Sequence, residues 1–379
     1  ETVKNAPQED CLAYSGGLDT SVAVPWLKEN YDAEIITCTI DLGMVDLETI
    51  RQRAYAVGAS EAVTVDGRET LVSEFLWPAL RAGAIYEGCR GHGAQAIAHG
   101  CTGKGNDQVR IEVGVAALTQ GVEVIAPIRE WGMNREDEVE YARERNLPIA
   151  PSNNKYSTDE NLWGRSAEAG ELEDPLNEPP EDAYEWTANP NAAPDEPAYV
   201  EIHFDEGIPT AVDGENMAGV DLITHLNHLA GAHGVGRIDH VENRLVGIKS
   251  REVYESPAAV ALHAAHRGLE TMTLSREQTR FKERVAQEYA ELVYNGLWFT
   301  AHRRDLDAYV ASTQRHVTGE VRIRLHKGTC VVAGRRADRP LYNYGLATYD
   351  RADEFDHTAA KGFIDIYGLP VRTQNRQQG

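Results

Sequence analysis

A short glycine-containing stretch near the start of the chain constrains the fold most strongly. Residues 13–21 read Ala-Tyr-Ser-Gly-Gly-Leu-Asp-Thr-Ser and lie between an apolar strand pattern and a helical one. A strand that turns through two glycines into a helix leaves backbone N–H groups directed at one point, where an anion binds. Asp19 requires a divalent cation between its carboxylate and a phosphate, so the stretch predicts a site for metal-bound polyphosphate. Glycine pairs also occur in turns that only permit close packing.

The pattern from Cys11 to about Arg145 alternates short β-branched runs with helical stretches. Strands are predicted over Cys11–Tyr14, Glu34–Ile40, Ala62–Val65, Ala94–His99 and Val122–Ile128. Helices are predicted over Ser21–Asn30, Leu47–Val57, Glu69–Arg81, Asp107–Leu118 and residues 134–145. This alternation is typical of an α/β fold, and it predicts a parallel-sheet domain with helices on both faces over residues 1–150. Ligands of such sheets bind beyond the carboxyl ends of the strands, where the glycine stretch lies.

A second glycine-rich loop, His99–Asp107, lies between a predicted strand and a predicted helix. Its three glycines let the backbone approach a ligand, and Lys104 offers a cation. Loops also collect glycine and asparagine for purely conformational reasons. Two dissimilar glycine-rich loops at strand ends of one sheet favour a joint ligand site.

The composition changes beyond Pro148, and residues 151–356 are expected to form a second, α+β domain. Residues 151–198 are rich in Pro, Asn, Glu and Trp and predict long irregular structure, in which Ser157 and Glu160 also fit the capping of a short helix. Strands follow over Tyr199–Phe204, Thr210–Val212, Gly319–Arg324 and Cys330–Ala333, with a turn at residues 207–209 and helices over Gly214–Ala230, Pro257–Leu269 and Arg276–Tyr294. Dense opposite charges in His233–Glu255 predict a partly buried ionic network with either a functional or a scaffolding role. The apolar-to-polar tail, residues 357–379, is expected to grip a neighbouring subunit or to dock on its own domain.

The charge balance excludes some classes of partner. The chain has 37 basic and 60 acidic side chains, a net charge of −23, which repels nucleic acids and anionic membranes. We therefore expect no nucleic-acid or membrane partner. The five cysteines are scattered, which argues against a disulfide framework or structural zinc site, and no export signal opens the sequence, so a cytoplasmic location is expected.

Four stretches together resemble the argininosuccinate synthase family of the PP-loop ATP pyrophosphatases: residues 13–21, His99–Arg110, Asp159–Ser166 and His233–Glu255. The likeness runs over nearly the whole chain. It implies an adenine nucleotide alpha hydrolase-like ATP-binding domain, an α+β synthetase domain and a C-terminal oligomerisation tail. The implied reaction joins L-citrulline and L-aspartate to argininosuccinate and releases AMP and pyrophosphate through a citrullyl-adenylate. The resemblance also implies a homotetramer.

The resemblance implies roles for individual residues. ATP and Mg²⁺ are expected to be held by Ala13, Tyr14, Ser15, Gly16, Gly17, Leu18, Asp19, Thr20, Ser21, Ile40, His99, Gly100, Gly103, Lys104 and Gly105. Aspartate is expected at Thr102, Asn106 and Asp107. Citrulline is expected at Asn106, Arg110, Ser157, Ser166, Glu242 and Tyr254, with its carboxylate on Arg110. Asp19, Lys104 and Asp107 are the expected catalytic residues, and Asp19 is the expected metal contact, through ATP.

The sequence departs from the family after Ile85-Tyr86-Glu87-Gly88. There the family continues through a loop and a helix that carry a citrulline-contacting tyrosine and serine, whereas this chain continues with Cys89-Arg90-Gly91-His92-Gly93. Loss of a packed crossover helix would expose core. We therefore expect the intact protein to carry this segment and to be heavier than 41.8 kDa.

Two other functions fit parts of the sequence. A PP-loop tRNA sulfur transferase would need a basic surface and a catalytic cysteine pair, and neither is clear here. A protein that binds nucleotide and aspartate without turnover would retain the loops alone. Citrulline-dependent release of pyrophosphate separates the three.

Overall fold

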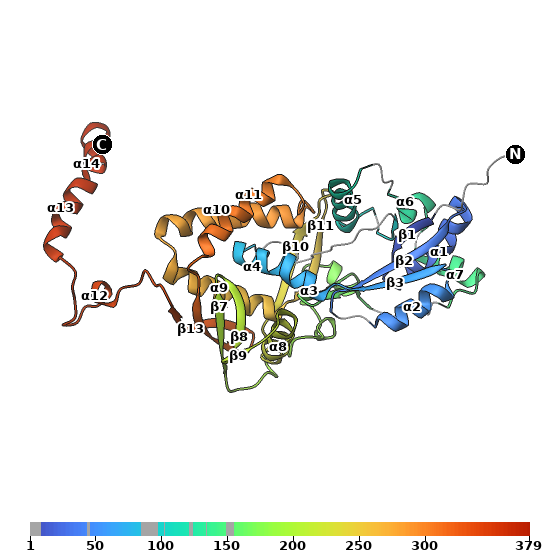
Figure 1. Cartoon of the computed structure of the whole chain (residues 1–379), viewed down its shortest axis with the longest axis horizontal. Helices are drawn as coiled ribbons and strands as arrows, with labels where there is room; N and C mark the ends of the chain where they lie inside the picture. The colour runs from blue at the N-terminus through green and yellow to red at the C-terminus, as the bar shows by residue number, and fades with distance from the viewer. Residues whose placement is uncertain are drawn as a thin grey trace. The chain divides into compact units, whose positions relative to one another are not determined.

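The computed structural model describes residues 9–43, 46–84, 98–101, 103–120, 124–133, 135–148 and 155–379. The chain divides into two compact units, residues 1–338 and residues 339–379. The larger unit contains one parallel and two antiparallel sheets (Figure 1).

The parallel sheet confirms the predicted α/β fold. Its strand order is β3-β2-β1-β4, formed by β1 (Glu9–Ala13), β2 (Glu34–Asp41), β3 (Glu61–Asp66) and β4 (Ala98–His99). Leu12 packs with residues of α1 (Leu18–Tyr31) and α2 (Leu47–Ala56), whereas the next residue, Ala13, packs against α5 (Asp107–Leu118). Because successive strand residues point to opposite faces, helices cover both faces of the sheet at β1. Of the predicted strand Ala94–His99, residues 94–97 lie outside the described residues.

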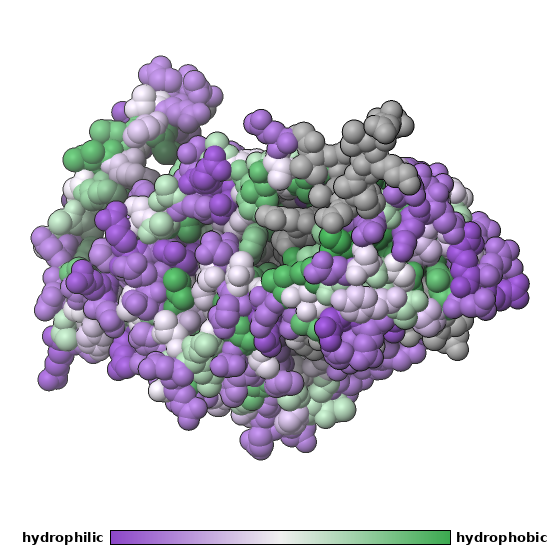
Figure 2. Space-filling model, turned by 45° about the vertical axis from the view of Figure 1, so that its right-hand side comes forward, coloured by the Kyte–Doolittle hydropathy of each residue, from purple (hydrophilic) through white to green (hydrophobic). Residues whose placement is uncertain are grey.

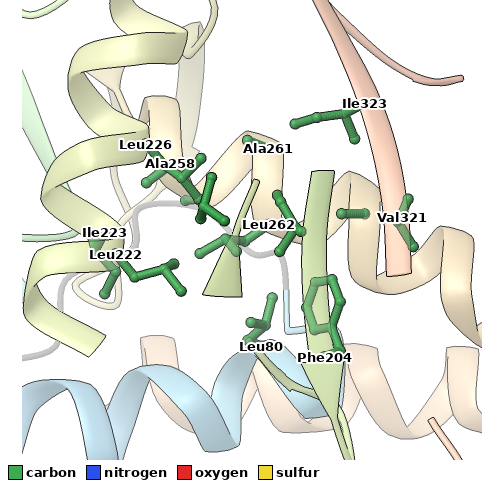
Figure 3. Close-up of a cluster of buried hydrophobic side chains, with 14 of the residues drawn as sticks. Leu80, Phe204, Leu222, Ile223, Leu226, Ala258, Ala261, Leu262, Val321 and Ile323 are labelled. Atoms are coloured by element: carbon green, nitrogen blue, oxygen red, sulfur yellow. The ribbon is translucent and has the colours of Figure 1, made fainter. Parts of the chain in front are cut away.

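The predicted helix Glu69–Arg81 is present as three consecutive pieces: α3 (Arg68–Thr70), the π-helical turn η1 (Leu71–Leu76) and α4 (Trp77–Ala82). Its apolar residues do not cover the parallel sheet. Leu71, Leu76 and Leu80 instead join the large core of the α+β part, where Leu80 lies beside Phe204 (Figure 3). On the edge strand β3, Val63 and Val65 remain 37% and 45% exposed.

The prediction of a strand over Val122–Ile128 is wrong at its end. Ile125 makes an isolated parallel bridge with Ala98, and the helix α6 (Pro127–Trp131) then begins, while residues 121–123 lie outside the described part. Proline has no N–H to donate to a ladder, but its fixed φ suits the first turn of a helix. Helix α7 (Arg135–Glu144) follows as predicted.

The stretch predicted to be irregular, residues 151–198, contains a β-hairpin. β5 (Ser157–Asn161) and β6 (Gly164–Glu168) pair antiparallel, so the alternative of a capped short helix at Ser157 is wrong. Only the short helices η2 (Gly170–Glu173) and η3 (Glu181–Ala183) follow. The hairpin joins β10 (Arg237–Asn243) and β11 (Lys249–Glu255) in a sheet of order β10-β11-β6-β5. Most residues of these two strands are polar, β5 is largely exposed, and Ala167 of β6 packs in a small core cluster, so the hydrophobic pattern gave no sign of a strand.

The third sheet has the order β13-β12-β7-β8-β9. It contains β7 (Ala198–Asp205), β8 (Ile208–Val212), β9 (Glu215–Asn216), β12 (Gly319–His326) and β13 (Thr329–Ala337). Around it lie α8 (Gly219–Ala232), α9 (Pro257–Thr273), α10 (Arg276–Tyr294) and α11 (Ala301–Gln314). Several boundaries differ from prediction. The helix predicted from Gly214 begins at Gly219, Pro209 lies in β8 rather than in the turn, and α9 and β13 each end four residues beyond their predicted ends. Helix α11 was not predicted.

The core of the larger unit lies between this third sheet and its helices. Phe204, Leu226, Leu262, Val321 and Ile323 are all fully buried and pack together (Figure 3). Each such side chain contributes about 1.5–3 kcal/mol relative to exposure. The elements that carry part of the site described below pack in smaller clusters of their own: Val253 of β11 with Ala167 and Leu172, and Tyr289 of α10 with Val285 and Val310.

The smaller unit contains α12 (Tyr344–Ala347), α13 (His357–Tyr367) and α14 (Leu369–Gln378). A helix with the length and hydrophobicity of a membrane span is not found among the described residues. The face of the molecule in Figure 2 is mostly hydrophilic, in keeping with the net charge of −23.

Candidate active site

The first glycine loop is held in a defined shape by its own hydroxyl groups and by the sheet. The Tyr14 N–H donates to the Cys38 carbonyl at 2.9 Å, and the Tyr14 hydroxyl lies 2.9 Å from that of Ser21. Gly16 has φ +76°, which glycine adopts without strain, and its carbonyl accepts a hydrogen bond from Arg53. The Gly17 N–H donates to Ser15 Oγ at 3.3 Å, and α1 begins at the next residue. The loop therefore presents the N-terminus of a long helix to the space beyond β1, as an anion site requires.

The second glycine loop lies beside the first. Ala13 and His99 pair directly across β1 and β4, so both loops leave the sheet at the same edge. A Cβ atom added to Gly100 would lie 2.7 Å from the Thr20 Cγ2 atom, which shows how closely the backbone of one loop approaches the other. The two loops are therefore neighbours, as the predicted joint ligand site requires.

Asp19 lies in the first turn of α1 and faces Glu138 of α7. Burial, together with the hydrogen bond and charge of Asp19, raises the pKa of Glu138 to about 8. Two carboxyl groups beside an anion site are the oxygen donors that Mg²⁺ takes from proteins, so this pair fits the ion. No group of three or more His, Cys, Asp or Glu side chains suited to a metal occurs in the part of the chain that is described. A resident cation would therefore need oxygens from a bound phosphate as well.

The other residues expected at the nucleotide occupy different settings. His99 is buried, accepts the Cys101 N–H at 3.3 Å and lies 3.2 Å from Glu112, and burial lowers its pKa. The His99 side chain thus stabilises the loop, and a ligand would contact the His99 backbone instead. Ile40 is half-buried on β2, Lys104 is exposed, and Thr102 lies outside the described residues.

Asn106, Asp107 and Arg110 lie at the start of α5, directly after the second loop. Arg110 is buried, and its Nη1 lies 3.1 Å from the Asp107 carboxylate. Its Nε donates to the Tyr294 carbonyl at 2.9 Å. The Asn106 amide is held at both ends, since Oδ1 accepts the Leu245 N–H and Nδ2 donates to the Tyr294 hydroxyl, each at 2.8 Å.

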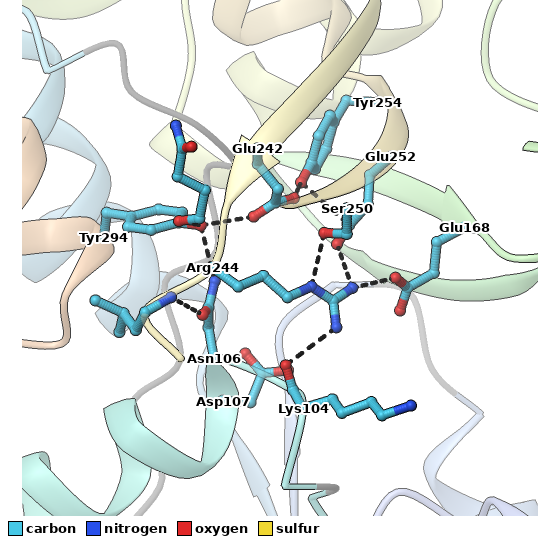
Figure 4. A network of polar contacts seen from close by, with 12 residues as sticks. Lys104, Asn106, Asp107, Glu168, Glu242, Arg244, Ser250, Glu252, Tyr254 and Tyr294 are labelled. Carbon is cyan, nitrogen blue, oxygen red and sulfur yellow. Dashed lines mark hydrogen bonds and ion pairs between the residues drawn. The ribbon is translucent and has the colours of Figure 1, made fainter. Parts of the chain in front are cut away.

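The remaining residues expected at citrulline all lie on the sheet β10-β11-β6-β5. Ser166 of β6 pairs with Tyr254 of β11, and Ser157 lies at the beginning of β5, opposite Glu168. The Tyr254 hydroxyl donates to Glu242 at 2.5 Å and lies 3.0 Å from Glu252 (Figure 4). The fold thus brings four residues together that are up to 97 positions apart in sequence, from Ser157 to Tyr254.

The network has further members that were not among the expected site residues: Glu168, Arg244, Ser250, Glu252 and Tyr294. Arg244 forms ion pairs with Glu168 and Glu252, and its Nη1 donates to the Lys104 carbonyl at 3.3 Å. The ionic network predicted for His233–Glu255 is confirmed, and it links the antiparallel sheet to the second glycine loop (Figure 4). The dense charge of that stretch signalled Arg244 and Glu252, whereas a single tyrosine at the end of an amphipathic helix gave no signal.

Comparisons with known proteins match the chain along almost its whole length. The family model described as "Arginosuccinate synthase N-terminal HUP domain" matches residues 9–92 and 89–148, and "Arginosuccinate synthase C-terminal domain" matches residues 156–374. The argininosuccinate synthase of Symbiobacterium thermophilum is 53% identical over 97% of each chain. That of Dehalococcoides mccartyi is 50% identical over 97% of this chain and 96% of its own, and that of Brevibacillus brevis is 50% identical over 95% and 91%.

The comparisons also locate the sequence departure. The alignment with the Symbiobacterium protein spans 390 positions, more than the 379 residues of this chain, and the N-terminal match divides into two pieces at residues 89–92. The sequence runs directly from Gly88 to Cys89, so the expectation that this chain carries the family's additional segment there is wrong. The junction itself lies outside the described residues. With both family domains matched and half of all residues shared with named relatives, the chain belongs to the argininosuccinate synthase family.

Proposed function

We propose a division of roles for the activity that family membership assigns to this chain. That activity is the ATP-dependent ligation of L-citrulline and L-aspartate to argininosuccinate, with release of AMP and pyrophosphate, in arginine biosynthesis. The observation that carries the proposal is the attachment of the second glycine loop, which lies beside the first, to the antiparallel sheet of order β10-β11-β6-β5: Asn106 Oδ1 accepts the Leu245 N–H, and Arg244 donates to the Lys104 carbonyl. This attachment would hold a nucleotide site and an amino-acid site next to each other.

The first loop, residues 13–21, is the proposed phosphate site. Its support is the N-terminus of α1, with the Ser15 and Thr20 hydroxyls 3.2 Å apart. Ile40 and the backbone of the second loop, at His99, Gly100, Gly103, Lys104 and Gly105, are proposed to contact the rest of the nucleotide. Lys104, whose side chain is exposed, is proposed to neutralise charge on the phosphates.

Mg²⁺ would be held by Asp19 together with phosphate oxygens, and Glu138 lies close enough to Asp19 to support that arrangement. When bound, the ion supplies neutralisation of phosphate charge.

The amino-acid substrates are proposed to meet at the start of α5. Thr102, Asn106 and Asp107 would hold aspartate, with Asp107 on the ammonium group. Arg110 would hold the citrulline carboxylate, because the Arg110 guanidinium group is already oriented by the Tyr294 carbonyl and the Asp107 carboxylate. Ser157, Ser166, Glu242 and Tyr254 would hold the rest of citrulline, with Glu242 on its amine or ureido end.

The chemistry needs positioning more than a strong base. The ureido oxygen of citrulline attacks the α-phosphorus of ATP, the bond to the bridging oxygen breaks, and pyrophosphate leaves. The aspartate amine then attacks the ureido carbon, loses a proton and displaces AMP, which carries the oxygen away. Transfers of this kind depend chiefly on alignment and on charge stabilisation.

The test is a pair of measurements on the purified chain with ATP, Mg²⁺, citrulline and aspartate. Pyrophosphate release is expected to require citrulline, and ¹⁸O in the ureido group is expected to appear in AMP. Release that requires tRNA would support a sulfur transferase instead. Nucleotide binding without release would show a protein that has lost turnover with the missing segment.

We infer that the functional form is a homotetramer in the cytoplasm. The smaller unit supports assembly, because a set of large apolar side chains on α13 and α14 is more than half exposed: Phe363, Ile364, Ile366, Tyr367, Leu369 and Val371. Light scattering should give about four times 41.8 kDa for the parent and for the control Asp365→Asn, and a smaller mass for Ile366→Asp. An unchanged mass for Ile366→Asp would contradict the role of the tail, and cell fractionation tests the location.

A further inference from the structure

Tyr294 is a buried residue that contacts groups from both proposed amino-acid sites. It is the last residue of α10 and is only 4% exposed. Its hydroxyl accepts a hydrogen bond from Asn106 Nδ2 at 2.8 Å and donates towards Glu242 Oε2 at 2.7 Å, with the Asn243 carbonyl at 2.9 Å (Figure 4). Asn106 lies 188 positions away in sequence and Glu242 lies 52 positions away.

The chemistry of Asn106, Tyr294 and Glu242 determines which group donates and which accepts in each hydrogen bond. An amide nitrogen only donates and a carboxylate only accepts, so a group between them must do both. The Tyr294 hydroxyl does so, whereas a phenyl ring would do neither. The Leu245 N–H, which can only donate, holds Asn106 Oδ1 at 2.8 Å, so this N–H and the Tyr294 hydroxyl together determine which way the Asn106 amide faces.

Tyr294 holds Arg110 as well. The Tyr294 carbonyl accepts from Arg110 Nε at 2.9 Å, and the guanidinium carbon lies 5.0 Å from the centre of the Tyr294 ring. The next turn approaches so closely that a Cβ atom on Gly296 would lie 2.7 Å from the Arg110 Cα atom. The end of α10 therefore fits against the start of α5 at backbone distance.

We propose that Tyr294 is a positioning residue of the ligation reaction. Its hydroxyl holds the Asn106 amide and the Glu242 carboxylate in a fixed position relative to each other. The inference rests on the proposed roles of Asn106 at aspartate and of Glu242 at citrulline. One hydroxyl then aligns the attacking amine with the ureido carbon. No contact of Tyr294 with a substrate is needed for this role.

The test compares Tyr294→Phe with Tyr289→Phe. Tyr289 lies on the same helix, is fully buried, and donates its hydroxyl to Asp307 at 2.7 Å, in a different core cluster. Each variant thus loses one buried hydroxyl and one hydrogen bond to a carboxylate, and Tyr294→Phe also removes the acceptor of Asn106 Nδ2, so it should lose at least as much stability as Tyr289→Phe. Thermal unfolding of both variants checks that they are folded at the assay temperature.

Only Tyr294→Phe is expected to change the kinetics selectively. The half-saturating concentrations of citrulline and of aspartate should each rise at least tenfold, as expected for the loss of one hydrogen bond to a charged group. The half-saturating concentration of ATP should stay within twofold of the parent value. In a double-mutant cycle, Tyr294→Phe should cost little more once Asn106→Ala is present, because the hydroxyl acts through that amide.

Three results would overturn the inference. One is a Tyr294→Phe enzyme with the same citrulline and aspartate requirements as Tyr289→Phe. Another is an equal rise for ATP, which would indicate general damage. The third is full additivity with Asn106→Ala. If the parent itself releases no pyrophosphate with citrulline, the proposed function fails first, and this inference fails with it.

Discussion

Replacement of Glu255 by glutamine tests how the polar segment beside the site is held. Glu255 ends β11, directly after Tyr254, and its carboxylate is 1% exposed. Oε1 accepts the N–H groups of Trp186 and Thr187 and the Thr187 hydroxyl, at 2.9, 2.8 and 2.7 Å. Oε2 accepts the Glu185 N–H at 2.9 Å and Arg165 Nη1 at 3.2 Å.

The cost of Glu255→Gln follows from this geometry. The amide oxygen can keep the three donors at the Oε1 position, but the amide nitrogen then faces the Glu185 N–H and Arg165 Nη1, which are themselves donors. Two hydrogen bonds to a charged group are lost, each worth about 1.5–3 kcal/mol, and Arg165 loses its buried counter-charge. We expect the free energy of unfolding to fall by about 3–5 kcal/mol.

The matched control is Glu185→Gln. Glu185 also pairs with Arg165, at 2.6 Å, but its side chain is 65% exposed, so this change should cost less than about 1 kcal/mol. Urea unfolding of the parent and both variants, followed by tryptophan fluorescence, measures the two losses of stability. The three proteins are compared with the same dependence of the free energy of unfolding on urea concentration. The reasoning would be refuted by a Glu255→Gln protein within about 1 kcal/mol of the parent, or by equal costs at the two positions.

Three further predictions concern the site and the core. Asp19→Asn should raise half-saturating Mg²⁺-ATP at least tenfold and leave that of citrulline nearly unchanged, because it removes the charge that attracts the cation; equal ATP kinetics would contradict the metal contact. Arg110→Lys should raise half-saturating citrulline about tenfold or more, since lysine cannot keep both the Tyr294 carbonyl and Asp107 while holding a carboxylate; an unchanged value would remove Arg110 from the site. Burial lowers the pKa of His266 below 6.5, so the unfolded chain takes up a proton that the folded chain does not, and stability should fall as the pH drops below 6.5. One such proton changes the free energy of unfolding by about 1.4 kcal/mol per pH unit. The urea midpoint of His266→Gln should therefore fall less steeply than that of the parent as the pH drops below 6.5.

The sequence by itself predicted the parallel sheet and its two glycine loops. Both are local features: a strand is marked by its β-branched run, and a loop by its glycines and polar groups. β1, β2 and β3 lie within one or two residues of their predicted bounds. The meeting of the loops at one edge follows from parallel pairing of β1 with β4.

The tertiary structure alone decided how the site is completed. The hairpin of β5 and β6 carries Ser157 and Ser166 on polar strands without hydrophobic alternation, and it exists because β6 pairs with β11 from another part of the chain. Whether Asp19 would have a carboxyl neighbour could not be read from sequence either, since Glu138 reaches it only through the packing of α7 on α1.

Tyr294 shows the limit most clearly. Its helix was predicted from residue 276 to residue 294 with the observed bounds, yet the pattern marks this residue only as one more apolar position. Its partners Asn106 and Glu242 are distant in sequence, and a hydrogen bond between distant residues leaves no local period or spacing. Local propensity therefore determined the strands of the parallel sheet and most helices, whereas pairing and packing between distant segments formed the hairpin of β5 and β6 and decided which polar groups meet.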